Sequence, residues 1–518
     1  MSKDSTTTLA DQVPARDLVA ARYHEAVKER QSNPDQIFYD AEDLTELDPN
    51  LVALSSATQE NPRAWSVRRK WVVTLLTGTY CFLAPFASTI FAPSLPSMMA
   101  DVGETDPVKG ALQIAIFLLS FALAPIFLAP LSEIHGRRPI LRYGNLFFAA
   151  FSLGSGFSQT TAQLSACRFL AGVGGSASMA VFGGVLSDVW PVKDRARASA
   201  ILGTTLMLGP VLGPACGGWM SERASWRWTC WVPVSSQFPP PVLGLTGMTN
   251  KAMAAVGLEL VSTFAFYESY IPSILTAKVK RLRKEQSNPD LYTVMDIDAA
   301  VMYLVLDPAL ALLSLYYAVV FGILYLIVVT FQFVFGQGYG HSPGVVGMDL
   351  ITEGVGAFIG MFTTAKLLDI VYRRQIQKKE YKSETRLISA FPGAIFVSTG
   401  LFIYGFTALR THFIVPLIGM LIFSFGMTNT YLAIQLYIID SFDYPASAIA
   451  GLSVLRCLFA AVFPLFGPRL IDSLGVDWGM ALLGFISLGL GLPFLPLIYH
   501  YGPRLRAVGK RNRTRLFG

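Results

Sequence analysis

Residues 129–139 read Ala129-Pro130-Leu131-Ser132-Glu133-Ile134-His135-Gly136-Arg137-Arg138-Pro139 and separate two apolar runs of helix length, 109–131 and 140–158. In this turn a carboxylate lies four residues before a pair of arginines, and a glycine lies between them. The glycine allows the backbone to reverse sharply, and the charges can form a compact network. The sequence therefore predicts a charged turn that joins two apolar helices.

The same kind of apolar run recurs along the chain. Of its 518 residues, 53% are apolar and 15% are charged, whereas a soluble domain carries about 25% charged residues. This composition argues against a soluble enzyme and a disordered chain. Each run has about the 20 residues that cross a bilayer as a helix. The twelve predicted spans are 71–95, 109–131, 140–158, 164–187, 198–220, 242–266, 309–331, 343–365, 387–406, 413–436, 446–467 and 479–499.

Basic residues indicate how these spans are oriented. The loops on the side of the N-terminus carry 28 Lys and Arg residues, and the opposite loops carry 5. This bias predicts that both termini are cytosolic. It also explains the net charge of +6 without a nucleic-acid partner. The five cysteines form no CxxC pair, so neither a disulfide framework nor a metal or other cofactor is expected.

The chain divides into five regions. We expect an all-α membrane protein with two six-helix halves around a central cavity. Three consecutive prolines, Pro239-Pro240-Pro241, cannot lie inside a helix, so an insertion is expected near 232–252, ahead of the sixth span. The regions are a disordered cytosolic tail (1–70), the first half (71–275), a cytosolic linker (276–308), the second half (309–499) and a basic cytosolic tail (500–518).

Several motifs resemble those of one family. Residues 129–139 resemble the pattern G-x-L-[SA]-[DE]-x-x-G-R-[RK] between helices two and three of the major facilitator superfamily, with Ala129 in place of the first glycine. Arg168-Phe169-Leu170-Ala171-Gly172 is similar to its intramembrane arginine motif, and residues 209–218 to its antiporter motif. Segments such as Tyr267-Glu268-Ser269-Tyr270-Ile271-Pro272 extend the likeness to the fungal drug:proton antiporter branch with twelve spans.

The resemblance implies a role for several groups of residues. A cytosolic charge network would latch the two halves in one state, although the arginines could also serve as anchors for the loop. The glycines and prolines of helix five would form a packing seam. The network comprises Glu133, Gly136, Arg137, Arg138, Asp188, Arg195 and Arg197, and the seam comprises Gly209, Pro210, Gly213, Pro214, Gly217 and Gly218.

Ionisable groups inside the spans are candidates for proton coupling, since a charge in the membrane is costly. Arg168 is the first candidate, with snorkelling to the interface as the alternative. Asp349 and Glu353 lie four residues apart, so one helix face could hold both, unless they remain hydrated near the outer mouth. Glu259 and Arg456 are further intramembrane charges. Polar or aromatic residues expected at the cavity are Tyr80, Tyr316, Tyr317, Asn429 and Gln435.

The predicted function is proton-coupled efflux of small hydrophobic organic compounds, either xenobiotics such as antifungal drugs or a secondary metabolite. The alternatives are polyamine export and a membrane sensor that kept the fold without transport. An enzyme is not expected, because the sequence contains no HExxH or GxSxG motif. The expected partners are the substrate, protons and the bilayer. A monomer in the plasma membrane, without nucleic acid, is expected.

Overall fold

The computed structural model describes residues 50, 52, 60–190, 192–235, 266–285, 308–378, 383–441 and 445–517. Most of the predicted tail 1–70 lies outside these ranges, as does the predicted sixth span except for its last residue, Phe266. Glu259 also lies outside them. Within the described ranges the chain is helical and contains no strand.

The first half starts with helices that have clear N-terminal caps. The side chains of Ser66, Asp106 and Thr160 accept hydrogen bonds from backbone N–H groups in the first turns of α3, α5 and α7, which satisfies donors that have no partner within the helix. The elements are η2 (Pro62–Ala64), α3 (Val67–Thr89), η3 (Ala92–Ser94), α4 (Leu95–Val102), α5 (Pro107–His135), α6 (Arg137–Gly156), α7 (Thr161–Val189), α8 (Val192–Arg223) and α9 (Arg227–Ser235).

After α11 (Ile271–Glu285), the second half contains a longer series of apolar helices. Its aromatic side chains form much of the largest buried cluster, with Tyr316, Tyr404 and Tyr437 almost fully enclosed. The elements are α12 (Pro308–Phe331), the π-helix η7 (Gln332–Gly338), α13 (Pro343–Asp349), α14 (Ile351–Lys378), η8 (Ser383–Ser389), α15 (Ala390–Thr407), α16 (Ile414–Ser441) and α17 (Pro445–Phe517).

Element α17 consists of two helices. Gly475 interrupts it with φ 72° and ψ 171°, a conformation that favours glycine because it has no Cβ. The apolar stretch Gly451–Ala507 has 57 residues, far more than the roughly 20 that one crossing needs. The chain therefore crosses once on each side of Gly475, which agrees with the predicted spans 446–467 and 479–499.

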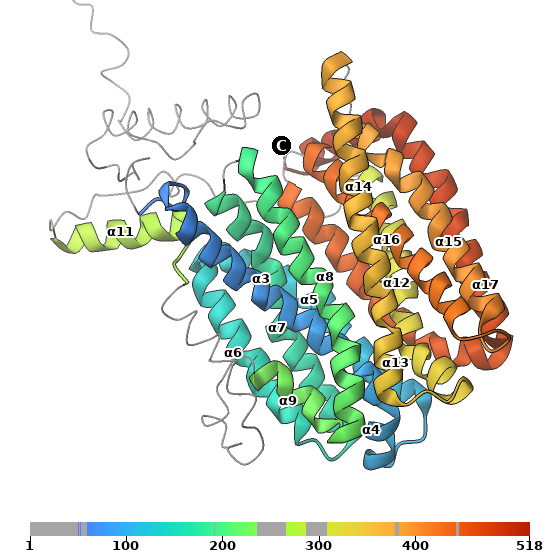
Figure 1. Cartoon of the computed structure of the whole chain (residues 1–518). Coiled ribbons are helices and arrows are strands. Elements are labelled where there is room, and N and C mark those ends of the chain that lie inside the picture. Colours follow the sequence, from blue (N-terminus) through green and yellow to red (C-terminus); the bar gives the residue numbers. More distant parts are fainter. Residues whose placement is uncertain are drawn as a thin grey trace, which may run out of the picture.

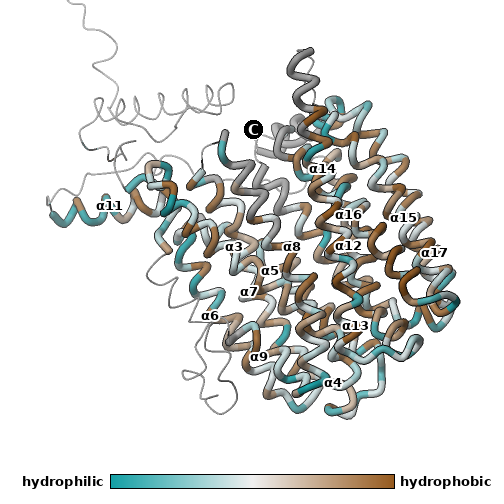
Figure 2. The backbone as a smooth tube through the Cα atoms, viewed as in Figure 1, coloured by the Kyte–Doolittle hydropathy of each residue, from teal (hydrophilic) through white to brown (hydrophobic). Residues whose placement is uncertain are grey.

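The helices are apolar enough for a membrane. By length and composition, eight helical stretches of the described residues could cross a bilayer, with α17 counted once. Helices α6 and α8 do not belong to this set, although both match predicted spans. Figure 2 shows hydrophobic residues along the bundle and hydrophilic ones on α11, which extends away from the bundle beside the start of α3 (Figure 1).

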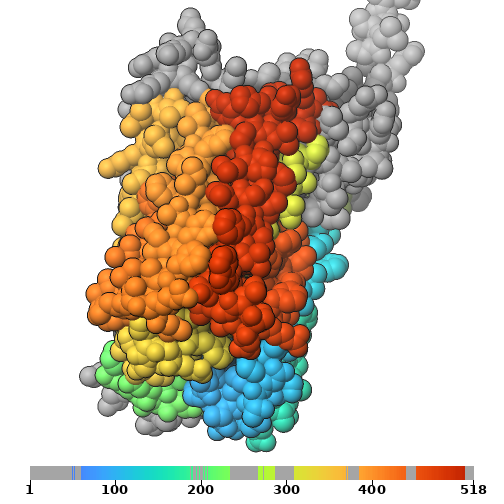
Figure 3. Space-filling model, turned by 90° about the vertical axis from the view of Figure 1, so that its right-hand side faces the viewer, coloured from blue at the N-terminus to red at the C-terminus, as the bar shows by residue number. Residues whose placement is uncertain are grey.

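The two halves lie side by side. Helices α3–α9 form one group and α12–α17 the other (Figure 1). The groups meet where α5 packs against α17 and where α8 packs against α13 and α14. We call the end of the bundle near α11 the α11 end, and the end near α4, α9 and α13 the α13 end. At the α13 end, the yellow segment around α13 lies beside green and blue parts of the first half (Figure 3).

The structure differs from the sequence prediction just before the expected insertion. Helix α9 starts at Arg227 and includes Pro233, in a region where no helix was predicted. The predicted span 343–365 matches the helical stretch Pro343–Leu368, in which one turn residue, Leu350, separates α13 from α14. The backbone N–H groups of Leu350 and Glu353 make hydrogen bonds on either side of this residue, so α13 and α14 form one crossing.

Candidate functional site

A cavity lies between the two halves near the middle of the bundle. Its walls come from α3, α5, α7 and α8 of the first half and from α12, α14, α16 and α17 of the second. A ligand there would therefore touch both halves at once.

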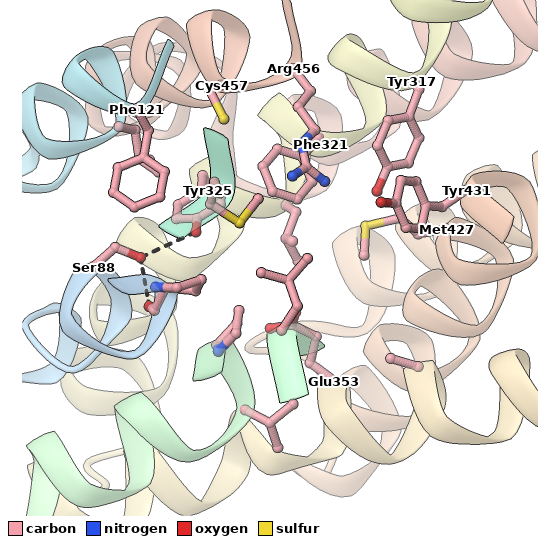
Figure 4. A pocket seen from close by; sticks show the side chains of 18 of the residues that line it. Ser88, Phe121, Tyr317, Phe321, Tyr325, Glu353, Met427, Tyr431, Arg456 and Cys457 are labelled. Carbon is pink, nitrogen blue, oxygen red and sulfur yellow. Dashed lines mark hydrogen bonds between the residues drawn. The ribbon is translucent and has the colours of Figure 1, made fainter. Parts of the chain in front are cut away.

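Most of the cavity wall is apolar or aromatic. Phe121 of the first half and Phe321 and Tyr431 of the second are among the large side chains that line it (Figure 4). One hydrogen bond in the wall joins the halves, between Ser88 Oγ and Tyr325 Oη, 3.2 Å apart. The surface is suited to a ligand with an apolar body and few polar groups.

Two charged side chains line the cavity among the described residues, Glu353 from α14 and Arg456 from α17. Both are almost completely buried, with 5% and 6% of their surface exposed. They lie on opposite sides of the pocket (Figure 4), and no ion pair joins them. The Arg456 guanidinium instead lies 5.0 Å from the ring centroid of Phe321 and 5.7 Å from that of Tyr431.

The halves are closely packed at the α13 end. A Cβ at Gly218 of α8 would collide with the backbone carbonyl of Pro343 in the other half. The Glu222 carboxylate of α8 accepts hydrogen bonds from Ser342 Oγ at 3.1 Å and from the backbone N–H of Gly344 at 3.0 Å. The start of α13 is therefore held by the opposite half.

These features, two helical halves around a central cavity with a glycine contact between them, match one family. The family model described as Major Facilitator Superfamily matches residues 78–464. The chain belongs to the Major Facilitator Superfamily. It is therefore a multi-pass membrane transporter and not an enzyme, and the fold class and family predicted from the sequence are confirmed.

Related proteins agree with this assignment. The efflux pump vrtL of Penicillium aethiopicum is 35% identical over 90% of this chain and 92% of its own length. The MFS-type transporter penM of Penicillium rubens is 34% identical over 90% of this chain and 91% of its own. The xylose transporter XylE of E. coli shares the fold, with a TM-score of 0.55 at 12% identity over 84% of this chain and 98% of that one.

The antiporter-motif glycines of this superfamily member bring α8 against two helices. A Cβ at Gly209 or Gly213 would meet backbone atoms of α3 at 2.8–3.0 Å, and one at Gly217 would collide with the Ile90 carbonyl just after α3. Pro210 lines the cavity, and the carbonyl of Pro214 closely approaches Gly347 of α13. The motif thus packs one face of α8 against α3 of the same half and another face against α13 of the second half.

The predicted charge network forms in part at the α11 end. Arg137 Nε lies 3.4 Å from Asp188 Oδ2, and its Nη1 donates to Ser132 Oγ at 2.6 Å. Burial raises the pKa of Asp188 to about 7, although Arg137 acts in the opposite direction. The side chains of Glu133, Arg195 and Arg197 lie outside the described part of the structure.

Glu268 is a member of this network to which the sequence analysis gave no role. Its carboxylate accepts hydrogen bonds from the backbone N–H groups of Arg137 at 2.9 Å and Arg138 at 3.0 Å, and so caps the start of α6. Gly136, at φ 95°, forms the turn before it, and a Cβ there would meet the Glu268 carboxylate. The segment 267–272 was noticed as a family likeness, but its distance along the chain hid the contact.

The second half has a comparable ion pair at the same end. Arg506 of α17 donates to the Glu384 carboxylate of η8 and to the backbone carbonyl of Ser441. Its guanidinium also lies 5.8 Å from the ring centroid of Tyr437. Each half therefore ties its own helices together at the α11 end, whereas the glycine contacts at the α13 end join the halves.

Arg168, the first candidate for proton coupling, is buried and bonded to the backbone. Its Nε donates to the Gln113 carbonyl at 2.8 Å, and its terminal nitrogens lie 3.4 and 3.5 Å from the Ala87 carbonyl. Only 4% of its surface is exposed, so it does not snorkel to the interface. Among the described residues no carboxylate forms an ion pair with it; the side chain instead joins α3, α5 and α7.

Asp349 and Glu353, which were predicted to share a helix face, have different surroundings. His341 Nδ1 lies 2.6 Å from Asp349 Oδ2, and the His341 ring packs 4.9 Å from Phe413. Glu353 lines the cavity, with no ion-pair partner among the described residues. The sequence analysis had no signal for His341.

Among the predicted cavity residues, Tyr317 is found in the cavity wall, stacked on Tyr431 with ring centroids 4.9 Å apart. Tyr80, Tyr316 and Asn429 are buried elsewhere in the bundle. Gln435 is half-buried and also lies away from the cavity. Residue type alone did not distinguish the face of a helix that meets the cavity from the face that meets a neighbouring helix.

Proposed function

We propose that this transporter exports small, largely apolar organic compounds from the cytosol in exchange for protons. The observation that carries the proposal is the cavity shared by both halves, with its apolar and aromatic walls and a single acid among its described lining residues. The relatives named efflux pumps, vrtL and radE of Floropilus chiversii, support export as the direction. A xenobiotic or a secondary metabolite of the cell fits this chemistry.

Polyamine export is the alternative that the cavity argues against. A polyamine carries several positive charges and needs several acids at membrane depth. Glu353 is the one acid among the described lining residues, and Arg456 would repel a cation. Asp349 is occupied by His341. A non-transporting sensor has no supporting observation in the described residues.

The orientation belongs to the same proposal. The excess of Lys and Arg in the loops on the side of the termini favours a cytosolic α11 end, which makes the α13 end external. We infer a plasma-membrane location and a monomer as the working unit. In this orientation the contact between Glu222 and the start of α13 would close the external side in the conformation described here.

Glu353 is the best candidate to carry the proton. It is a carboxyl group that a ligand in the cavity could reach, and burial in a membrane protein favours its neutral form unless a cation faces it. Arg168 has its hydrogen bonds satisfied by backbone carbonyls, so its role in this proposal is to hold α3, α5 and α7 together. Asp349, paired with His341, is a secondary candidate.

The test uses inside-out vesicles that contain the full chain. Accumulation of a fluorescent apolar compound is followed with an imposed pH gradient and after an ionophore collapses it. The wild type is expected to accumulate the compound only with the gradient. Glu353→Gln should lose the dependence on the gradient, and Asp349→Asn, the same carboxylate-to-amide change four residues earlier, should keep it. Equal accumulation with and without the gradient in the wild type would refute proton coupling.

A further inference from the structure

The surroundings of Arg456 show a buried cation without an acidic partner. The side chain is 6% exposed, and its Nε is buried without a hydrogen-bond acceptor. The aromatic rings of Phe321 and Tyr431 lie near its guanidinium, and the side chains of Tyr317 and Cys457 also interact with it. Among the described residues no carboxylate forms an ion pair with it. Aromatic faces compensate only part of the cost of a buried cation.

Arg168 shows that this bundle can satisfy a buried arginine when its task is structural. There, Nε donates to one carbonyl at 2.8 Å and the terminal nitrogens approach another. Arg456 has a comparable degree of burial but lines the cavity. Its charge is therefore directed at the space that a substrate would occupy.

We propose that the cavity recognises organic anions: compounds with an apolar or aromatic body and one carboxylate, sulfonate or phenolate group. This inference rests on the proposed function and names its substrate class. The anionic group pairs with the Arg456 guanidinium, which presents several donors in a planar fork. The body of the compound lies against the rings of Phe321, Tyr317 and Tyr431, which line the same pocket (Figure 4).

The position of Glu353 is consistent with this assignment. It lies on the opposite side of the pocket from Arg456 (Figure 4), so an anion bound at Arg456 does not have to displace an internal ion pair. A protonated Glu353 adds no negative charge next to the anion, whereas an ionised one repels it. A cationic compound is disfavoured, because Arg456 repels it whether Glu353 is protonated or ionised.

Binding to the purified full-length protein tests the proposal without any gradient. The probes are anthracene-9-carboxylate, 9-anthracenemethanol and 9-(aminomethyl)anthracene, which share one aromatic body and carry a negative, no and a positive charge. Equilibrium dialysis at pH 7.5 measures their affinities. Because a hydrogen bond to a charged group is stronger than one between neutral groups, the carboxylate should bind about 10-fold more tightly than the alcohol, and the amine most weakly.

Arg456→Gln should bind the carboxylate and the alcohol equally, and Arg456→Lys should keep part of the preference. Arg410→Gln is the matched control, because it also removes one positive charge but from an exposed arginine paired with Asp477. If Arg456→Gln aggregates during size-exclusion chromatography, Arg456→Met replaces it, since an apolar side chain of similar length leaves no buried polar group unpaired.

Equal affinity of the wild type for the three probes would overturn the proposal, and so would a carboxylate preference that survives in Arg456→Gln or Arg456→Met. These outcomes are separate from failure of the proposed function. A protein that prefers the carboxylate through Arg456 but shows no gradient-driven accumulation supports the anion site and contradicts proton-coupled export. Gradient-driven accumulation without any preference among the probes supports proton-coupled export and contradicts the anion site.

Discussion

The two ends of this bundle are held together in different ways. At the α13 end, contacts cross between the halves: Gly218 of α8 lies against Pro343, and Glu222 binds the start of α13. At the α11 end, the described ion pairs stay within one half, Arg137 with Asp188 and Arg506 with Glu384. A contact between halves has to break when access changes sides, whereas a contact within a half can move as a unit. We therefore expect substitutions at the two ends to impair transport in different ways.

The largest effect is expected from Gly218→Leu. A leucine there would meet the Pro343 carbonyl of the other half, and overpacking costs about 1–3 kcal/mol. If this cost destabilises only the conformation in which α8 and α13 are in contact, the equilibrium between the two conformations shifts about 5- to 150-fold. Efflux from vesicles should fall by a similar factor, while the folded fraction in detergent stays near that of the wild type.

Two glycines on the same helix provide controls for this experiment. Gly203→Leu should have little effect, because nothing lies within 4 Å of a Cβ at that position. Gly217→Leu should instead lower the folded fraction, since it drives a side chain into Ile90 of its own half. Normal efflux by Gly218→Leu would mean that the close approach of α8 and α13 is not required for transport.

Arg137→Ala should have the next largest effect on efflux, although it costs more stability, because its contacts lie within one half. It removes the ion pair with Asp188 and the hydrogen bond to Ser132, and the loss of one partner from a buried pair costs about 3–5 kcal/mol. Efflux should fall while membrane insertion, measured by surface labelling, is unchanged. Arg142→Ala, an exposed arginine on the same helix, should behave like the wild type. Full efflux by a normally inserted Arg137→Ala protein would mean that this charge network is not required for transport.

A smaller, pH-dependent effect is expected at Asp188. Burial raises its pKa to about 7, so the folded state binds a proton more tightly than the unfolded state does. The resulting stability is present at low pH and is lost as the pH rises through about 7. Lowering the pH from 8 to 6 should therefore raise the unfolding temperature of the wild type more than that of Asp188→Asn. Identical pH profiles for the two proteins would show that Asp188 does not titrate in this range.

The smallest effect is expected from Glu60→Gln. Glu60 pairs with Lys278 at 3.1 Å and with Arg281 at 3.4 Å, and its side chain is 41% exposed. Exposed ion pairs contribute about 0–1 kcal/mol and are screened by salt. Efflux and unfolding temperature should stay close to the wild-type values at 0.15 M salt. A large loss of efflux would mean that the position of α11 controls the α11 end of the bundle.

The sequence predicted the spans better than the contacts between them. Long apolar runs had to be helices because lipid satisfies no backbone groups, and the loop motif 129–139 identified the superfamily. Helix α9 was missed because an insertion was expected near 232–252, whereas the helix runs from Arg227 to Ser235 with Pro233 inside it. Asp349 meets His341 whereas Glu353 lines the cavity, and nothing in the local sequence distinguished the two carboxylates.

The candidate site was less predictable because it depends on residues that are distant along the chain. Glu268 caps α6 from 131 positions away, and Glu222 reaches Gly344 across 122 positions. A single sequence contains no signal for such pairs. Arg456 was recognised as a charge inside a span, but its position beside Phe321 and Tyr431 depends on how α12, α16 and α17 pack.

The contact of Glu222 with the start of α13 also has a consequence for biogenesis. The ribosome makes Glu222 more than a hundred residues before Ser342 and Gly344, so the acceptor is in the membrane before its donors have been synthesised. The first turn of α13 can complete its hydrogen bonds only after the second group of helices has docked onto the first. Halves produced as separate polypeptides would therefore leave this turn without its Glu222 acceptor until they meet.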